Sequence, residues 1–131
     1  MAQFNGVMPH LKMRHFAETK SFYTDLLGFK ATVCWPVESP SLCVVSKDGV
    51  RLMFDLCADW DDPGSAPTLT GQMVFDVTDV LQLFESLKDK VDVLWGPEVY
   101  AYGRREFSIK DPNGYRLVFS ETTDDPVTCQ E

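Results

Sequence analysis

The chain has 131 residues, of which 44% are hydrophobic and 24% charged, as expected for a single soluble globular domain. Its 12 basic and 20 acidic side chains give a net charge of −8, which argues against a nucleic-acid partner because phosphates repel an acidic surface. No apolar run is long enough to span a membrane and residues 1–7 do not form a signal peptide, so we expect a cytoplasmic protein.

The first part of the chain predicts a strand, a helix and three further strands. Alternating side chains over 7–14 predict the first strand. An apolar stripe over 18–27 predicts a helix, and Gly28 is a typical stop signal after it. Three short strands are then expected over 30–35, 41–46 and 50–56. The predicted order of these elements is β-α-β-β-β.

The same order is predicted again in the second part of the chain. A strand over 71–77 is followed by Thr78 or Asp79 as the expected N-cap of a helix that extends through Lys90. Three more strands are expected over 91–95, 104–109 and 115–120.

An internal repeat divides the chain into two modules. The polar hairpin turn at Gly49 returns at Gly114, half a chain length later, with similar strands on both sides. The segment between the modules is rich in Asp, Pro, Gly and Ser, which is typical of a linker. The expected organisation is one domain made of module one (1–56), a linker (57–70), module two (71–121) and an acidic tail (122–131).

Alternation along the strands predicts two different faces for each sheet. In the last strand of module one, Leu52 and Phe54 share one face, while Met53 and Asp55 share the other. A helix must cover the apolar face, so the predicted fold class is α+β. The mixed face indicates a curved mixed sheet around a semi-polar cavity, and a plain solvent-facing side is the alternative.

Three stretches carry a family resemblance: residues 9–14 with Phe22-Tyr23 after them, Gly-Arg-Arg-Glu-Phe at 103–107, and Asp-Pro-Asn-Gly at 111–114. In order and spacing they resemble the vicinal oxygen chelate superfamily, which includes glyoxalase I, extradiol dioxygenases and bleomycin-resistance proteins. The resemblance implies the glyoxalase/bleomycin-resistance fold of paired β-α-β-β-β modules. It does not by itself specify a reaction.

Metal-dependent members of that superfamily carry a His or Glu near the start of each module's first strand and near the middle of its last strand. The corresponding positions here are Met8, Met53, Gln72 and Val118. Two thioethers, an amide and an aliphatic group make no competent site for zinc, nickel or iron(II), so we expect no metal and no cofactor. An alignment shifted by two residues would instead make His10 a ligand.

The metal-free members most similar in type are the bleomycin-resistance proteins. The resemblance implies a homodimer with possible exchange of amino-terminal strands, in which clefts bind a drug without altering it. We therefore expect a binding protein rather than an enzyme, one that sequesters a bleomycin-type antibiotic or another planar or cationic compound. A metal-dependent glyoxalase or dioxygenase with an unrecognised site is the alternative.

Seven residues are candidate ligand contacts, chosen by strand parity, by aromatic character or by the resemblance: His10, Trp35, Met53, Asp55, Gln72, Tyr102 and Val118. The aromatic members would stack on a planar ligand. Two alternatives stay open: His10 is equally compatible with a bond to a neighbouring strand, and Trp35 with ordinary packing at the sheet edge.

The four cysteines, Cys34, Cys43, Cys57 and Cys129, have no zinc-site spacing. A hairpin would bring Cys34 and Cys43 opposite each other, although free thiols are the expected state. The sequence does not decide their oxidation state.

Overall fold

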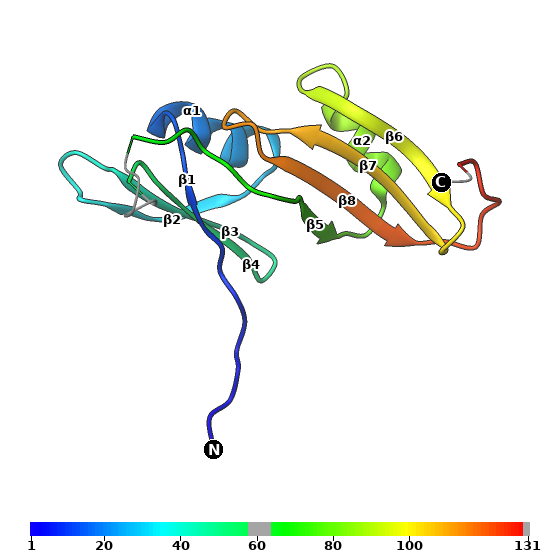
Figure 1. The fold of residues 1–131 in the computed structure, drawn as a ribbon, viewed down its shortest axis with the longest axis horizontal. Coiled ribbons are helices and arrows are strands. Elements are labelled where there is room, and N and C mark those ends of the chain that lie inside the picture. Colours follow the sequence, from blue (N-terminus) through cyan, green and yellow to red (C-terminus); the bar gives the residue numbers. More distant parts are fainter. Residues whose placement is uncertain (58–63, 130–131) are drawn as a thin grey trace. The chain divides into compact units, whose positions relative to one another are not determined.

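The computed structural model describes residues 1–57 and 64–129, and the chain forms two compact units, Met1–Thr68 and Leu69–Glu131. Each unit contains its own four-stranded sheet (Figure 1). Among the described residues, no helix has both the length and the apolar character needed to cross a membrane.

Unit one contains β1 (His10–Lys12), α1 (Phe16–Ser21), η1 (Phe22–Leu26), β2 (Lys30–Trp35), β3 (Leu42–Lys47) and β4 (Val50–Asp55). The strand order across its sheet is β1-β4-β3-β2. β1 runs parallel to β4, and the other neighbours are antiparallel.

Unit two contains β5 (Met73–Asp76), α2 (Val80–Leu87), β6 (Asp92–Tyr100), β7 (Arg104–Lys110) and β8 (Arg116–Thr122). Its strand order, β5-β8-β7-β6, repeats that of unit one, and β5 is again parallel to its neighbour. The predicted α+β fold of two β-α-β-β-β modules is therefore confirmed.

The apolar face of each sheet packs against the helix of its own unit, as strand parity predicts. In unit one, Leu52 and Phe54 are buried, and the Phe54 ring lies 4.7 Å from the ring of Tyr23 in η1. In unit two, Phe107 of β7 lies 5.3 Å from Phe84 of α2. Burying these large side chains supplies most of the stabilisation of each unit.

The helix of unit one differs from its prediction in its first residue and in the form of its last turn. It begins at Phe16 rather than at residue 18, and it ends in the wider turn η1, where the Leu27 N–H donates to the Phe22 carbonyl at 3.3 Å. Gly28 ends the helix as predicted, with a φ of +76° that favours glycine.

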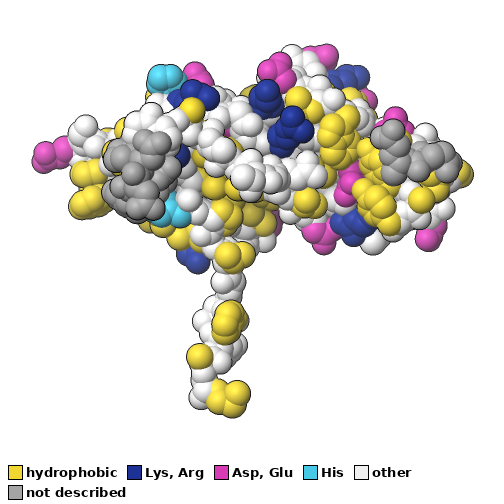
Figure 2. All heavy atoms as spheres, in the orientation of Figure 1, with side chains coloured by type: hydrophobic (Ala, Val, Ile, Leu, Met, Phe, Trp, Pro, Cys, Tyr) yellow, Lys and Arg dark blue, Asp and Glu magenta, His cyan; other side chains and the backbone are white. Residues whose placement is uncertain are grey.

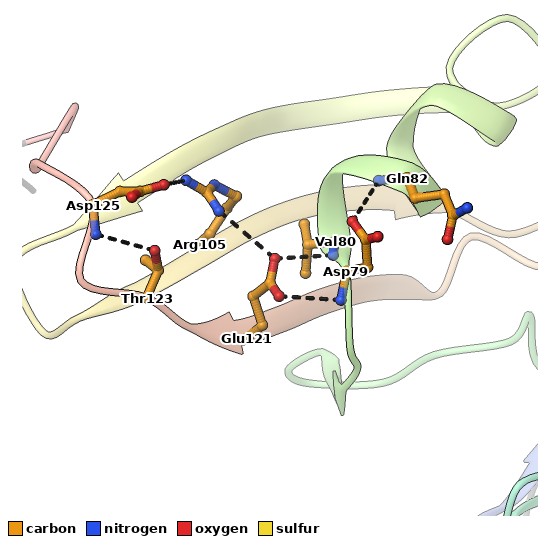
Figure 3. A network of polar contacts seen from close by, with 7 residues as sticks. All are labelled: Asp79, Val80, Gln82, Arg105, Glu121, Thr123 and Asp125. Atoms are coloured by element: carbon orange, nitrogen blue, oxygen red, sulfur yellow. Dashed lines mark hydrogen bonds and ion pairs between the residues drawn. The ribbon is translucent and has the colours of Figure 1, made fainter.

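The start of α2 is fixed by two carboxylates (Figure 3). Asp79 is the N-cap, as predicted, and accepts a hydrogen bond from the Gln82 N–H at 3.2 Å. Glu121 of β8 accepts from the N–H groups of Asp79 and Val80 at 3.1 and 2.9 Å. Arg105 lies 3.8 Å from Glu121 and balances its charge. The helix ends at Leu87 and does not reach the predicted end three residues later.

The strand predicted over 91–95 is too short. β6 continues through Gly96 to Tyr100, and its register with β7 shifts on both sides of Trp95. Gly96 has a φ of +82°, and a Cβ there would lie 2.4 Å from the carbonyl oxygen of Glu106. Only glycine permits this close approach of the two strands.

The first predicted strand, over 7–14, is longer than β1. Before β1 the chain projects from unit one as a segment with hydrophobic side chains along it (Figure 2). Phe4 is 95% and Val7 87% exposed.

The carboxyl-terminal segment returns to the sheet of unit two. The N–H groups of Thr128 and Cys129 donate to the Val99 carbonyl at 2.9 and 3.2 Å. The Thr128 hydroxyl accepts from the Val99 N–H at 2.7 Å. Part of the segment expected to be a tail therefore lies along β6.

Candidate functional site

Four predicted ligand residues share the face of unit one's sheet that points away from α1. Strand register places His10 beside Met53, and it places Trp35 and Asp55 in one row with Leu42 between them. We call this set the unit-one face. Paired residues of neighbouring strands point to the same side, so the register puts Trp35 on the same face as His10, Met53 and Asp55.

His10 and Asp55 bind each other on this face. The His10 Nε2 atom lies 3.1 Å from Asp55 Oδ2, with 37% of the histidine side chain and 9% of the aspartate side chain exposed. Asp55 Oδ1 also accepts from the Cys57 N–H at 2.9 Å. His10 therefore has the neighbouring-strand partner that the sequence left open, and both Asp55 oxygens already accept a hydrogen bond.

Trp35 is not packed at the sheet edge. It is 62% exposed, and its neighbours Val33 and Val37 are 48% and 83% exposed. An indole with this much free surface is available to stack on a planar molecule.

The four positions that correspond to family metal ligands do not fit a metal. In unit one Met53 lies beside His10, while in unit two Gln72 precedes β5 and is exposed, and Val118 is only 1% exposed. Among the described residues, no three His, Cys, Asp or Glu side chains gather in a group that could hold an ion. The donor chemistry of these positions is wrong for zinc, nickel or iron(II).

A connected set of polar side chains crosses the corresponding face of unit two, away from α2. Arg104 donates to Asp76 Oδ1 at 2.8 Å and to the Ser120 hydroxyl at 2.7 Å. Ser120 donates to Glu106 Oε2 at 2.6 Å, and the Tyr102 hydroxyl donates to Glu106 Oε1 at 2.5 Å. We call these five residues the unit-two network. It joins β5, β8, β7 and the turn between β6 and β7.

The two ends of this network are exposed and its middle is buried. The Asp76 side chain is 85% exposed and Tyr102 63%, whereas Ser120 is fully buried. Ser108, on the same face, is also fully buried, and its hydroxyl has no hydrogen-bond partner among the described residues. Each buried hydrogen bond of the network is held in a low dielectric, where it is stronger than in water.

Two further aromatic rings adjoin the network at Tyr102. Tyr102 stacks on Tyr100 with ring centroids 5.5 Å apart and an interplanar angle of 2°. Tyr100 in turn meets Trp95 edge to face at 6.0 Å. Although Tyr102 stacks on Tyr100, it is 63% exposed, so much of its surface is accessible to a ligand.

Tyr102 is a neutral hydrogen-bond donor over the physiological range. Loss of hydration, the hydrogen bond to Glu106 and the negative charge of that carboxylate raise the pKa of Tyr102 to about 12. The phenol therefore keeps its proton, and Glu106 keeps both an acceptor role and its position beside the ring.

The structure separates the three candidates from module two. Tyr102 belongs to the unit-two network. Val118 is buried two residues before Ser120 on β8, and Gln72 lies outside the sheet. Sequence reasoning missed Glu106 and Ser120 as parts of a site. The alternation of polar residues along β7 was a usable signal for Glu106, but only strand register reveals its partner on β8.

Comparisons with known proteins agree with the fold. A family model described as "Glyoxalase/Bleomycin resistance protein/Dioxygenase superfamily" matches residues 8–119. No curated protein matches the chain.

Solved structures give the same architecture at low identity. A protein of unknown function from Agrobacterium tumefaciens is 22% identical with a TM-score of 0.73, covering 93% of this chain and 97% of that one. A superfamily member from Sphaerobacter thermophilus is 19% identical with a TM-score of 0.74, covering 87% and 94%. A virulence protein from Salmonella typhimurium is 19% identical with a TM-score of 0.70, covering 94% and 100%. Because its family model spans most of the sequence and its sheets have the matching topology, the chain belongs to the glyoxalase/bleomycin resistance protein/dioxygenase superfamily.

Proposed function

We propose that this protein is a metal-independent binding protein that holds a planar, positively charged small molecule. The superfamily contains both enzymes and binding proteins, so membership leaves the activity open. The observation that carries the proposal is Tyr102, which is 63% exposed, stacked on Tyr100 and fixed through its hydroxyl by Glu106. A rigid, accessible ring of this kind binds another flat ring at little entropic cost.

The charges near Tyr102 favour a cation. Glu98 and Glu106 are register partners on β6 and β7, so two carboxylates lie on neighbouring strands of one face. Like charges in directly opposed positions destabilise a sheet, and a bound cation would relieve that repulsion. A cation over a tyrosine ring is also attracted by the ring itself. The net charge of −8 would further concentrate cations near the protein.

We propose a bleomycin-type antibiotic, which is planar in part and cationic, as the first ligand to test. Trp35 and the rest of the unit-one face, His10, Met53 and Asp55, would supply secondary contacts. The exposed Phe4 and Val7 support a homodimer, because pairing with a second copy would remove these side chains from water. Sequestration of the drug would then be the biological role.

The direct test is calorimetric titration of the purified protein with metal-free bleomycin, with and without a chelator. A planar cationic dye and its neutral analogue form a second pair of ligands. The proposal expects binding that a chelator does not change, a preference for the cationic dye, and weaker binding to Tyr102→Ala. Equal affinity of both dyes for wild type and Tyr102→Ala would contradict it. If the cationic dye binds and bleomycin does not, the proposed site stands but bleomycin is not its ligand.

A further inference from the structure

Two of the four cysteines lie directly opposite each other in unit one. Cys34 on β2 and Cys43 on β3 are register partners, and their Sγ atoms are 3.9 Å apart. Opposed residues in an antiparallel sheet have Cα atoms about 4.5–5.5 Å apart, which lies within the range of about 4.4–6.8 Å found in disulfides. The backbone of the hairpin is therefore already spaced for a bond between these two sulfurs.

The remaining approach is within the reach of the side chains. The sulfurs must close from 3.9 Å to a covalent length of about 2.05 Å, which requires rotation about the Cα–Cβ bonds. Among the described residues, β2 pairs only with β3, and its register with β3 shifts between Ala31 and Val33. An edge strand with a bulge adjusts more easily than a central strand.

The two thiols differ in accessibility and in acidity. Cys43 is 1% exposed, whereas Cys34 is half-buried. Neither cysteine is part of a disulfide. Burial, followed by the charge of Cys34 and its hydrogen bond, raises the pKa of Cys43 to about 12. Cys43 is therefore a protonated, protected thiol, and Cys34 is the sulfur that a reagent from solvent meets first.

We propose that Cys34 and Cys43 are a peroxide-sensitive dithiol that closes to an intramolecular disulfide. The Cys34 thiolate attacks hydrogen peroxide, the O–O bond breaks, and a sulfenic acid and hydroxide form. Cys43 then attacks the Cys34 sulfur: the S–S bond forms, the S–O bond breaks, and the leaving hydroxide takes up the Cys43 proton as water. Two thiols and one peroxide thus give one disulfide and two waters.

The first step prepares the second. Oxidation of Cys34 places an electrophilic sulfur directly opposite its register partner Cys43. The inference concerns unit one alone and does not depend on ligand binding by unit two. Closure would also join β2 to β3 directly beside Trp35.

The test uses the full-length reduced chain, treated with hydrogen peroxide and analysed by mass spectrometry. Both cysteines fall in the tryptic peptide 31–47, and Glu38 lies between them. The expected product is this peptide lighter by two hydrogen atoms, with its two fragments still joined after cleavage at Glu38. A reductant should restore the original mass.

Three variants complete the test. A chain with Cys57→Ser and Cys129→Ser should still form the bridge. Cys43→Ser should stop at an oxidised Cys34, and Cys34→Ser should leave Cys43 reduced. Addition of oxygen to Cys34 in the wild type while Cys43 stays a thiol would overturn the proposal, as would bridges that form only through Cys57 or Cys129. The wild-type peptide map decides the question even where a variant fails to fold.

Discussion

The two units have the same strand order but carry different chemistry on equivalent faces. On the unit-one face the polar pair of His10 and Asp55 joins β1 to β4. On the unit-two face five side chains are hydrogen-bonded in a continuous series from Asp76 to Tyr102. A repeated backbone therefore does not imply a repeated site. Unit two has a polar surface of connected hydrogen bonds, whereas the prominent side chain of the unit-one face is the exposed indole of Trp35.

The hairpin turns of the two units also differ, and again unit two has more hydrogen bonds to a buried side chain. In unit one Asp48 has a φ of 49° and its side chain is 89% exposed. In unit two Asp111 is buried, and its Oδ1 atom accepts from the N–H groups of Asn113 and Tyr115 at 2.8 and 2.9 Å. The second turn is held by a buried carboxylate, and the first has no counterpart of that bond.

The largest expected effect is a difference in the free energy of unfolding between variants of these two turns. Asp111→Ala leaves two buried N–H groups without their acceptor, so we expect a loss of about 3 kcal/mol in the free energy of unfolding. Asp48→Asn keeps a residue that tolerates the turn and should change stability by less than about 0.5 kcal/mol. Denaturant unfolding of both variants measures the difference. Similar losses would mean that the turns are equivalent despite their different burial.

The next effect compares the starts of the two helices. Glu121→Ala removes the acceptor for two N–H groups at the start of α2 and should cost about 1.5 kcal/mol. No side chain caps α1 at His15, so His15→Ala should cost less than about 0.5 kcal/mol. Urea denaturation measures both. Glu121→Gln keeps one acceptor oxygen, so its loss of stability should lie between those of Glu121→Ala and His15→Ala. A loss as large as that of Glu121→Ala would mean that the negative charge of Glu121, and not its hydrogen bonds, stabilises the start of α2.

A smaller effect compares the two aromatic surfaces as ligand contacts. Loss of the stacking surface in Tyr102→Ala should weaken binding of a planar cation about fivefold, equivalent to about 1 kcal/mol. Trp35→Ala should reduce affinity less, because no carboxylate network adjoins that indole among the described residues of unit one. Tyr102→Phe keeps the ring and serves as the matched control. If Trp35→Ala has the greater effect, the main site is on unit one.

The smallest effect is the titration of Tyr102. The pKa of Tyr102 is raised from 10.0 to about 12, so its contribution to stability is complete below pH 10 and is lost as pH rises toward 12. The difference in phenolate absorbance between wild type and Tyr102→Phe should have its midpoint near this value. Glu106→Gln should lower that midpoint. An unchanged midpoint would show that Glu106 does not contribute to the raised pKa of Tyr102.

Local patterns in the sequence were enough to predict the fold. Alternation located the strands, and both the Asp79 cap and the Gly28 stop depend only on neighbouring residues. The extension of β6 was missed because Gly96 and Pro97 resemble the end of a strand, while the actual reason for Gly96 is its contact with β7. That contact is a property of two strands and not of one.

The candidate site was only partly predictable for the same reason. Tyr102 was expected from its aromatic character and its place beside Gly103. Its connection to Arg104 and Asp76 passes through Ser120, and these residues come from three strands whose alignment no local pattern specifies. Strand parity assigns each side chain to a face of the sheet, but only the register between strands decides which side chains meet.

The carboxyl-terminal segment that returns to β6 also limits pairing between the edge of β6 and strands of other molecules. Thr128 bonds to the Val99 backbone and, through its hydroxyl, to the Glu98 carboxylate at 2.5 Å. These bonds use backbone groups at the outer edge of β6 that another chain would otherwise pair with. In the described part of unit one, β2 is also an edge strand and has no comparable cover. The returning segment therefore shields the edge of β6 at Val99 from pairing with a strand of another molecule.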